Sequence, residues 1–337
     1  MTKKSHPAHS ITVLGAGGWG TCLAILLANK GHRITLWGHS ASHISEVTRS
    51  RRNKLFLPGV PIPKEIQLTS KLSDAWRGNP EIVVLAIPSQ YLRQVLERCG
   101  SFLWERALVV SAGKGIEEKT LLRMSGLIRS VVPARRIAAL SGPSISYEVA
   151  RGVPTTVVAA SADLRSAQKI QQIFSGERFR VYTSADLIGV ELGGSLKNVI
   201  AIACGIGDGL GFGANTKAAL VTRGLVEMAR LGIAMRAKRE TFSGLSGLGD
   251  LVTTCFSPHS RNRGVGEKLG KGMPLAKITT KMEQVAEGIP TAQSAYQLAR
   301  RYQVEMPITA AVHSVLYEKK SPLQMARELM LREPKPE

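Results

Sequence analysis

The sequence predicts an α/β protein, in which a doubly wound, largely parallel sheet is followed by an all-helical C-terminal domain. In the first half, short apolar runs rich in Val, Ile and Leu alternate with longer segments, which is typical of strands buried on both faces of a parallel sheet. From Asp186 onward, small and apolar residues recur at helical spacing without a convincing strand. At 337 residues the chain also exceeds the usual size of a single hydrophobic core.

Seven short segments are expected to form the strands. They are ITVLG (11–15), RITLWG (33–38), EIVVLAI (81–87), ALVVSAG (107–113), RIAALSG (136–142), TTVVAA (155–160) and FRVY (179–182). In the second half, TKAALVTRGLVEMARLG (216–232) repeats its apolar positions every three or four residues, so we expect an amphipathic helix there. The boundary is predicted near 185–190, with a first domain over 1–187 and a second over 188–337.

Composition limits the class of protein. A hydrophobic fraction of 44% with 21% charged residues is typical of a globular chain. No apolar run reaches the roughly 18 residues that a bilayer span needs, and the polar start MTKKSHPAHS is unlike a secretory signal. The four cysteines form no CxxC pair, and no metal-ligand spacing occurs among His32, His43, His259 and His313. We therefore expect a reduced, cytoplasmic protein with no integral membrane segment and no metal site.

The net charge of +20, from 45 Lys and Arg against 25 Asp and Glu, would attract polyanions. Most basic residues are dispersed, although RSRRNK (49–54) holds four in six positions. Aromatic residues make up only 5% of the chain, and none interleave with basic ones as stacking platforms do. A basic, solvated surface that attracts anionic small ligands is therefore favoured over a nucleic-acid-binding one.

A glycine motif, Gly15-x-Gly17-x-x-Gly20, directly follows the first predicted strand and opens a predicted helix. Its first glycine permits the turn, the second lets the backbone approach a pyrophosphate, and the third lets helix and strand pack closely. Such a motif is weak evidence when it stands alone. Here the strand before it, the helix after it and the next strand all lie where a βαβ unit requires them. The sequence thus predicts a Rossmann-like dinucleotide site rather than a glycine-rich turn that binds nothing.

The end of the second predicted strand bears on cofactor preference. An NAD site usually has a carboxylate there, which holds the ribose hydroxyls and repels a 2′-phosphate. This chain has Trp37-Gly38-His39-Ser40 instead, and no acid until Glu46. NADP(H) is therefore favoured over NAD(H), with His39 and one of Arg49, Arg51 or Arg52 near the phosphate; these arginines are equally compatible with solvated loop charges.

Further stretches combine glycine with polar residues. SAGKGIE (111–117) places Lys114 just after a strand, where ligands gather in open α/β sheets, and SGPSISYEVARG (141–152) follows the next strand. GLSGLGDLVTTC (244–255) carries Asp250, and ELGGSLKNVIAIACG (191–205) holds Lys197 among small apolar residues. In SPHSRNRG (257–264) a predicted helix start offers backbone amides and an arginine fork, which suit a phosphate.

Each of these residues also has an ordinary structural interpretation. Lys197 could be a helix-edge lysine that extends its side chain to water, and Lys114 a simple loop charge. Asp250 and Ser260 could be helix caps.

Taken together and in order, these segments resemble the bacterial NAD(P)-dependent glycerol-3-phosphate dehydrogenases. The similarity extends from Ile11 to Leu331 and includes GAGGWGT, SAGKGIE, SGPS, GVELGGSLKNVIAIACGIGDGLGFGANTKAAL, GLGDLVTTC, SRNR and QVAEG. It implies hydride transfer between NAD(P) and the pair sn-glycerol 3-phosphate and dihydroxyacetone phosphate. It further implies a homodimer that mainly makes glycerol 3-phosphate for phospholipid synthesis.

The resemblance also implies roles for individual residues. Lys197 would be the proton donor and acceptor at the substrate's central oxygen, with Lys114 and Asp250 bordering the reacting carbons. The implied substrate-binding set is Lys114, Gly142, Ser144, Lys197, Asn198, Asp250, Ser260, Arg261 and Asn262, with Thr254 as a further contributor. The implied cofactor-binding set is Gly15, Gly17, Gly18, Trp19, Gly20, His39, Lys114, Ser146, Arg261, Val285 and Glu287. By base rates, an ordinary surface role is nearly as well supported for Glu287.

Two other functions are compatible with parts of this pattern. A 3-hydroxyacid dehydrogenase also places a lysine on the first helix of its helical domain, but a carboxylate substrate needs a different clamp from Asp250 and the Ser260–Asn262 segment. A nucleotide-sensing or polyanion-binding protein without catalysis would be favoured if Lys197 or Lys114 were replaced, and both are present.

Overall fold

The computed structural model describes residues 8–100, 102 and 104–334, and the chain divides into two compact units. The first unit comprises Met1–Gly113, Ser125–Leu140 and Ser144–Ala185; the second comprises Lys114–Met124, Ser141–Pro143 and Asp186–Glu337. Two segments that precede position 187 thus belong to the helical unit, which a boundary drawn along the sequence does not anticipate. Of the polar start MTKKSHPAHS (1–10), which we interpreted as unlike a secretory signal, residues 1–7 lie outside the described residues.

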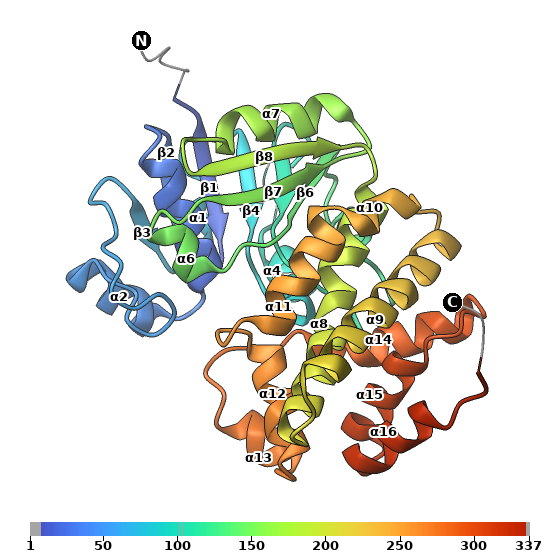
Figure 1. Cartoon of the computed structure of the whole chain (residues 1–337). Coiled ribbons are helices and arrows are strands. Elements are labelled where there is room, and N and C mark those ends of the chain that lie inside the picture. The colour runs from blue at the N-terminus through green and yellow to red at the C-terminus, as the bar shows by residue number, and fades with distance from the viewer. Residues whose placement is uncertain (1–7, 101, 103, 335–337) are drawn as a thin grey trace. The chain divides into compact units, whose positions relative to one another are not determined.

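An eight-stranded sheet in the order β3-β2-β1-β4-β5-β6-β7-β8 forms the first unit (Figure 1). The strands are β1 (Ser10–Leu14), β2 (Arg33–Trp37), β3 (Gln67–Thr69), β4 (Ile82–Leu85), β5 (Leu108–Ser111), β6 (Arg136–Ser141), β7 (Thr155–Ala160) and β8 (Phe179–Ser184). The pairs β3–β2, β2–β1, β1–β4, β4–β5, β5–β6 and β7–β8 are parallel. Because β2 and β4 flank β1, the winding reverses there, and the loop after β1 lies at the switch point where such sheets bind ligands. The predicted α/β fold class is confirmed.

All seven predicted strands are present, and their ends shift by a few residues. Central strands such as β4 are buried along their whole length, which explains their continuous apolar sequences. β3 was not predicted. It is a three-residue strand, Gln-Leu-Thr, at the edge of the sheet and is only partly buried, so it carries no apolar run.

The helices that accompany the sheet are α1 (Gly18–Ala28), α2 (Ala41–Ser50), α3 (Leu72–Ala75), α4 (Ser89–Arg98), α5 (Met124–Val131), α6 (Ser146–Ala150) and α7 (Leu164–Phe174). Ser40 caps α2 by accepting from the His43 N–H, and Asp163 caps α7 in the same way from Arg165. α1 contacts both α6 and α7.

The helical unit is built around α8 (Leu187–Gly209), which contacts α9 (Ala214–Ala234), α11 (Asp250–Phe256), α12 (Arg261–Gly270), α14 (Gly288–Arg301) and α15 (Pro307–Tyr317). The other elements are α10 (Arg239–Ser243), the π-helical turn η1 (Leu245–Gly249), α13 (Leu275–Thr280) and α16 (Pro322–Met330). Glycines bring α8 and α12 into backbone contact: a Cβ on Gly205 would lie 2.0 Å from the Arg263 carbonyl oxygen, and one on Gly266 would lie 2.1 Å from that of Ile202. Glycines on both helices therefore allow α12, which begins at Arg261, to approach α8 closely.

By length and composition α8 could also cross a membrane, since it has 23 residues and a mean hydropathy of 1.5. No continuous apolar run in this helix reaches 18 residues, but the glycines and single polar residues that interrupt the runs lower the average hydropathy too little for the helix to fail this test. Within the helical unit, 94% of the apolar window is buried, as in the core helix of a soluble protein.

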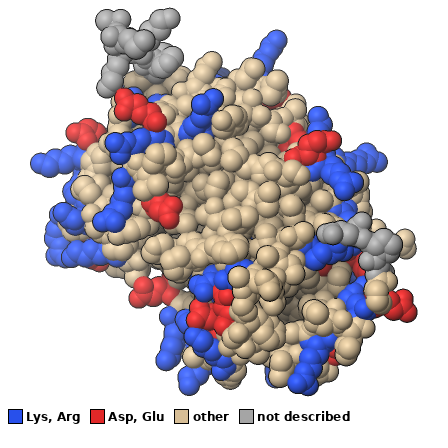
Figure 2. All heavy atoms as spheres, viewed as in Figure 1, with Lys and Arg blue, Asp and Glu red and all other residues tan. Residues whose placement is uncertain are grey.

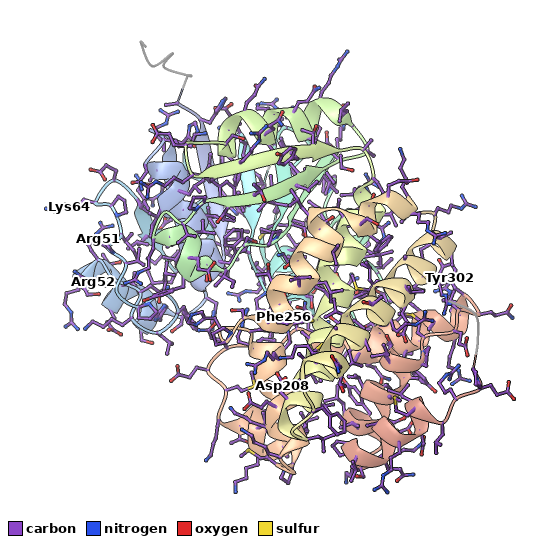
Figure 3. The ribbon with its side chains drawn as sticks, in the orientation of Figure 1. Arg51, Arg52, Lys64, Asp208, Phe256 and Tyr302 are labelled. Carbon is purple, nitrogen blue, oxygen red and sulfur yellow. The ribbon has the colours of Figure 1, made fainter. Side chains whose placement is uncertain are left out.

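Charged side chains, Lys and Arg together with fewer Asp and Glu, lie mostly near the rim of the face shown in Figure 2. Arg51, Arg52 and Lys64 lie around α2 and the loop that follows it (Figure 3). The Arg51 guanidinium donates to the backbone oxygens of Ile66, at 2.9 Å, and Pro63, at 3.4 Å. Of the three arginines considered for a 2′-phosphate, Arg51 is thus already engaged with the backbone, whereas Arg49 and Arg52 are exposed.

Candidate active site

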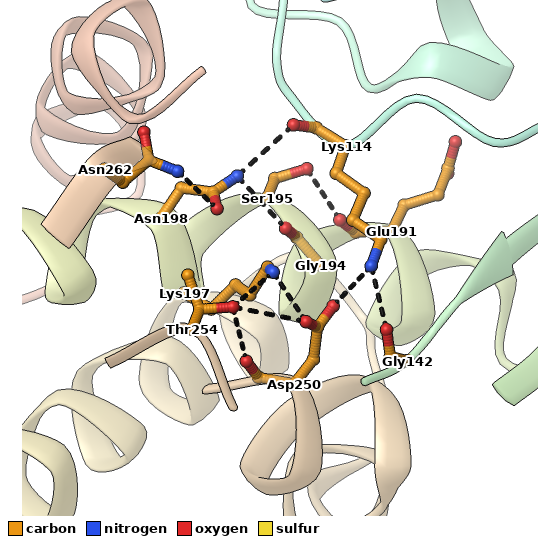
Figure 4. Close-up of polar contacts among 10 residues, drawn as sticks. All are labelled: Lys114, Gly142, Glu191, Gly194, Ser195, Lys197, Asn198, Asp250, Thr254 and Asn262. Carbon is orange, nitrogen blue, oxygen red and sulfur yellow. Dashed lines mark hydrogen bonds and ion pairs between the residues drawn. The ribbon is translucent and has the colours of Figure 1, made fainter. Parts of the chain in front are cut away.

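Lys197 lies near the middle of α8 and is only 7% exposed. Its Nζ donates to Asp250 Oδ1 and to Thr254 Oγ1, both at 2.5 Å (Figure 4). An ammonium group has three N–H donors, and in the described part of the chain the third has no partner. The interpretation of Lys197 as a lysine that extends to water is therefore wrong, and its buried ammonium retains one donor for a further acceptor.

Asp250 connects two lysines. Its carboxylate is 2% exposed; Oδ1 faces Lys197, and Oδ2 accepts from Lys114 Nζ at 2.7 Å (Figure 4). Asp250 is the first residue of α11, directly after η1, and its side chain makes these ion pairs instead of capping the helix. One turn later, Thr254 Oγ1 donates to the Asp250 carbonyl at 2.7 Å and accepts from Lys197, so α11 supplies two partners for that lysine.

Lys114 follows β5 but belongs to the helical unit. Its Nζ also donates to the Gly142 carbonyl at 2.9 Å, and Gly142 has a φ of +131°, a conformation that favours glycine. Arg123 and Glu191 form an ion pair between the 114–124 segment and the first turns of α8. Ser294 Oγ donates to the Ile116 carbonyl at 3.2 Å. These contacts hold Lys114 beside Asp250.

The Arg123–Glu191 pair was missed in the sequence reasoning. The signal for it was present, because Glu191 stands in the apolar stretch GVELGG, and a buried carboxylate requires a partner. The sequence does not reveal which basic residue that partner is.

The electrostatics of the site favour a lysine that can exchange a proton. Burial lowers the pKa of Lys197 from 10.5 to about 8, since desolvation penalises the ammonium form. Asp250 opposes this lowering of the pKa, and the neighbouring charge of Lys114 reinforces it. Both protonation states of Lys197 are therefore accessible near neutral pH, as general acid and base chemistry requires.

The predicted phosphate-binding segment lies at the start of α12. Ser260 is its N-cap and accepts from the Arg263 N–H at 3.2 Å. Arg261 is the first helical residue; it is exposed, and its guanidinium makes no hydrogen bond or ion pair with the described residues. Two further residues, missed from the sequence, fix this helix: Arg263 Nε donates to Asp208 Oδ2 at 2.7 Å, and Asp208 also pairs with Lys217 on α9 (Asp208 is labelled in Figure 3).

Two buried amides link the helices. Asn262 Nδ2 donates to Asn198 Oδ1 at 2.9 Å, and Asn262 Oδ1 accepts from the Gly288 N–H at 2.9 Å. Asn262 therefore orients Asn198, which follows Lys197 on α8, and connects α12 to the start of α14. Val285 and Glu287, both half-buried, lie in the segment that leads into α14.

In the first unit, the glycine loop has the shape its motif predicts. Gly15 has a φ of +116°, and a Cβ there would lie 2.3 Å from the Ala86 carbonyl oxygen. A Cβ on Gly20 would lie 1.8 Å from the Gly15 oxygen, whereas one on Gly17 would meet nothing within 4 Å. No side chain caps α1, so its first amides remain available, and Trp19 Nε1 is a buried donor without a partner in the described chain. This arrangement fits the pyrophosphate of a dinucleotide.

Other expected cofactor residues of this unit lie nearby or at the end of β2. Ser146, at the start of α6, approaches the loop, since a Cβ on Gly18 would lie 3.2 Å from its Oγ. His39 is exposed just after β2. Ser144 is half-buried in the same unit, whereas the remaining expected substrate residues belong to the helical unit.

Comparison with known proteins gives the family. Models described as NAD-dependent glycerol-3-phosphate dehydrogenase N-terminus and C-terminus match residues 10–167 and 186–327. A protein of Geobacter metallireducens is 52% identical over 97% of this chain and 98% of its own, and one of Citrifermentans bemidjiense is 48% identical over 98% and 99%; both are named glycerol-3-phosphate dehydrogenase [NAD(P)+]. The chain belongs to the NAD-dependent glycerol-3-phosphate dehydrogenase family. It is an NAD(P)-dependent oxidoreductase, and the predicted resemblance is confirmed.

A crystal structure of the glycerol-3-phosphate dehydrogenase of Coxiella burnetii agrees with this family assignment. The two structures superpose with a TM-score of 0.93, and the sequences are 38% identical. The match covers 96% of this chain and 99% of the Coxiella burnetii chain. A D-mandelate dehydrogenase with NADH shares the fold at a TM-score of 0.63 and 14% identity.

Proposed function

We propose that this enzyme interconverts sn-glycerol 3-phosphate and dihydroxyacetone phosphate, with Lys197 exchanging the proton at the central oxygen of the substrate. The observation that carries the proposal is the Lys197–Asp250–Lys114 cluster, in which one buried carboxylate joins the buried Lys197 and the half-buried Lys114 at 2.5 and 2.7 Å. We assign dinucleotide binding to the domain over 1–187 and the substrate site to that over 188–337, and we add to the substrate site Lys114 and Gly142, which belong to the helical unit.

The bound dinucleotide would be held by the glycine loop and would donate or accept the hydride. In the reduction, negative charge develops on the carbonyl oxygen of the substrate. The remaining N–H of Lys197 stabilises that charge and then delivers its proton. In the oxidation, neutral Lys197 accepts the alcohol proton. Lys114 adds a second positive charge, and Asp250 holds both lysines in place.

The phosphate of the substrate is assigned to the start of α12. Replacing Arg261 by alanine should raise the KM for dihydroxyacetone phosphate about 10- to 100-fold and change kcat little, because the arginine–phosphate contact exists equally in ground and transition states. Steady-state kinetics measure both constants. At saturating dinucleotide, both enzymes should turn over unphosphorylated dihydroxyacetone equally. The exposed Arg301 provides the control variant Arg301→Ala. A fall in kcat at unchanged KM would contradict the assignment.

NADPH is proposed as the favoured cofactor, because no carboxylate lies between the end of β2 and Glu46 and the basic residues around α2 would attract a 2′-phosphate. Wild-type kcat/KM should be higher for NADPH than for NADH. His39→Asp should shift this ratio towards NADH by about tenfold or more, since an added carboxylate repels the phosphate and binds the ribose hydroxyls. The control Ser45→Asp places the same charge on an exposed position of α2. An unchanged ratio in His39→Asp would refute this placement.

The setting that we propose is a cytoplasmic homodimer that binds neither nucleic acid nor metal and mainly supplies glycerol 3-phosphate for phospholipid synthesis. The reduction direction is supported by the NADPH preference proposed above. The oligomeric state can be measured by light scattering after gel filtration, where a monomer would contradict the proposal.

A further inference from the structure

The basic run RSRRNK contains one residue that does not face solvent. Asn53 is 1% exposed, and its Nδ2 donates to the Ala16 carbonyl and to Thr21 Oγ1, both at 2.9 Å. Its Oδ1 accepts from the Phe56 N–H at 3.2 Å. Asn53 thus contacts the glycine loop and the first turn of α1 at once, from a position 37 residues away in sequence from Ala16.

These hydrogen bonds fix the orientation of one peptide group. In a planar trans peptide the C=O and the N–H point in opposite directions, and the described chain has no cis peptide bond. The bond from Asn53 directs the Ala16 carbonyl towards the 53–57 segment, so the Gly17 N–H points away from it. Among the described residues that N–H has no hydrogen-bond partner. It is therefore available to an acceptor on the open side of the loop.

An external constraint is needed because the loop is rich in glycine. Glycine allows many backbone conformations, and a Cβ on Gly17 would meet nothing within 4 Å, so the loop's own packing does not hold this peptide. On the other side the 53–57 segment lies close to the loop, since a Cβ on Gly18 would lie 2.5 Å from the Phe56 oxygen. A donor at Asn53 is thus placed to restrict the peptide before any ligand binds.

We propose that Asn53 is a positioning residue for the dinucleotide, which holds the Ala16–Gly17 peptide so that its N–H faces the pyrophosphate. This inference rests on the proposed placement of the dinucleotide on the Gly15–Gly20 loop. Without Asn53, the loop must be ordered when the ligand binds, and the free energy of that ordering weakens binding.

The variant Asn53→Asp tests this with almost no change in shape. Aspartate cannot donate, and its carboxylate repels the Ala16 oxygen. The dissociation constants of NADPH and NADH should both rise about 10- to 100-fold, in line with the loss of two buried hydrogen bonds. At saturating dinucleotide, kcat and the KM for dihydroxyacetone phosphate should stay within about twofold. Fluorescence titration and steady-state kinetics measure these quantities.

The pH dependence of the same variant gives a second readout. A protonated aspartic acid can donate one hydrogen bond, so the affinity of Asn53→Asp for NADH should recover as the pH is lowered. NADH is the probe because it lacks the 2′-phosphate, which titrates in this range. An affinity that stays equally weak at every pH would contradict the role of the donated hydrogen bond.

Two further variants distinguish an effect on the conformation of the glycine loop from a general loss of stability. Ser161→Ala removes another buried hydrogen bond of this unit, at 2.7 Å to the Ile137 carbonyl, and should lower the melting temperature while leaving dinucleotide affinity unchanged. Thr21→Val removes only one of the two acceptors of the Asn53 amide. It should weaken dinucleotide binding less than Asn53→Asp does. This variant provides the test if Asn53→Asp fails to fold. Unchanged affinity in Asn53→Asp, or in Thr21→Val if Asn53→Asp does not fold, would overturn the inference.

A loop variant distinguishes this inference from the proposal on which it rests. Gly17 has a φ of −75° and open space at its Cβ position, so Gly17→Asp should fold and place a carboxylate at the proposed pyrophosphate site. Unchanged dinucleotide affinity in Gly17→Asp would refute the placement of the dinucleotide itself. Weakened affinity in Gly17→Asp with unchanged affinity in Asn53→Asp would refute only the role of Asn53.

Discussion

Replacing Lys197 by alanine is expected to lower kcat for the reduction of dihydroxyacetone phosphate by about 10³- to 10⁴-fold. The variant lacks the ammonium group proposed to stabilise the negative charge that develops on the substrate oxygen. It also lacks the proton that this group would transfer to that oxygen. Lys114 remains, but its Nζ donates to the Gly142 carbonyl and to Asp250. The measurement is single-turnover and steady-state oxidation of NADPH.

Controls separate chemistry from folding. The affinity for NADPH should be unchanged in Lys197→Ala, because the proposed dinucleotide loop belongs to the other unit. Lys271→Ala removes a lysine whose side chain is 61% exposed and should behave as wild type. Lys197→Arg retains the charge but not a readily released proton, and should remain well below wild type. A rate within about tenfold of wild type in Lys197→Ala would show that another group transfers the proton.

Asp250→Asn should reduce turnover by about 10²- to 10³-fold and also change its pH dependence. The amide keeps the shape but removes the negative charge between two ammonium groups. Because Asp250 raises the pKa of Lys197 against the effect of burial, its neutralisation should move that pKa below about 8.

The direction of the pH effect follows from the role of the proton. Reduction needs protonated Lys197, so in the wild type its rate should fall as pH rises through about 8; oxidation needs neutral Lys197 and should rise over the same range. In Asp250→Asn both transitions should move to lower pH, so that acid conditions partly restore reduction. No such restoration is expected in Lys197→Ala. An unshifted profile in Asp250→Asn would show that Asp250 does not control this titration.

Strands can be predicted from the sequence where burial determines which residue types they contain. Strands buried on both faces must be apolar throughout, and for this reason β4 and β5 are recognisable without tertiary information. β3 carries no such pattern because its pairing with β2, not its composition, makes it a strand. The membership of 114–124 in the helical unit likewise depends on partners such as Glu191 and Ser294, which lie far along the chain.

The residues of the proposed site also fall into two groups, those that can be recognised from the sequence and those that cannot. Lys197, Lys114 and Asp250 stand out because charged residues among glycines and apolar residues are unusual, and the order of the motifs links them. The residues that hold them in place carry no such signal. Asn53 is hidden in a basic cluster, and Arg263 is one arginine among several; their partners lie 37 and 55 residues away. Residue type can be read from sequence, whereas a pairing at that separation is known only from the fold.

The mixed origin of the helical unit limits how the protein can be dissected. A fragment that begins at residue 186 would contain Lys197, Asp250 and Thr254 but lack Lys114, Gly142 and Arg123. Glu191 would then be a buried carboxylate without its arginine, and Asp250 would keep only one of its two lysines. The proposed acid–base group is complete only when the three stretches 114–124, 141–143 and 186–337 come together, so a cut at the apparent domain boundary would remove part of the proposed active site.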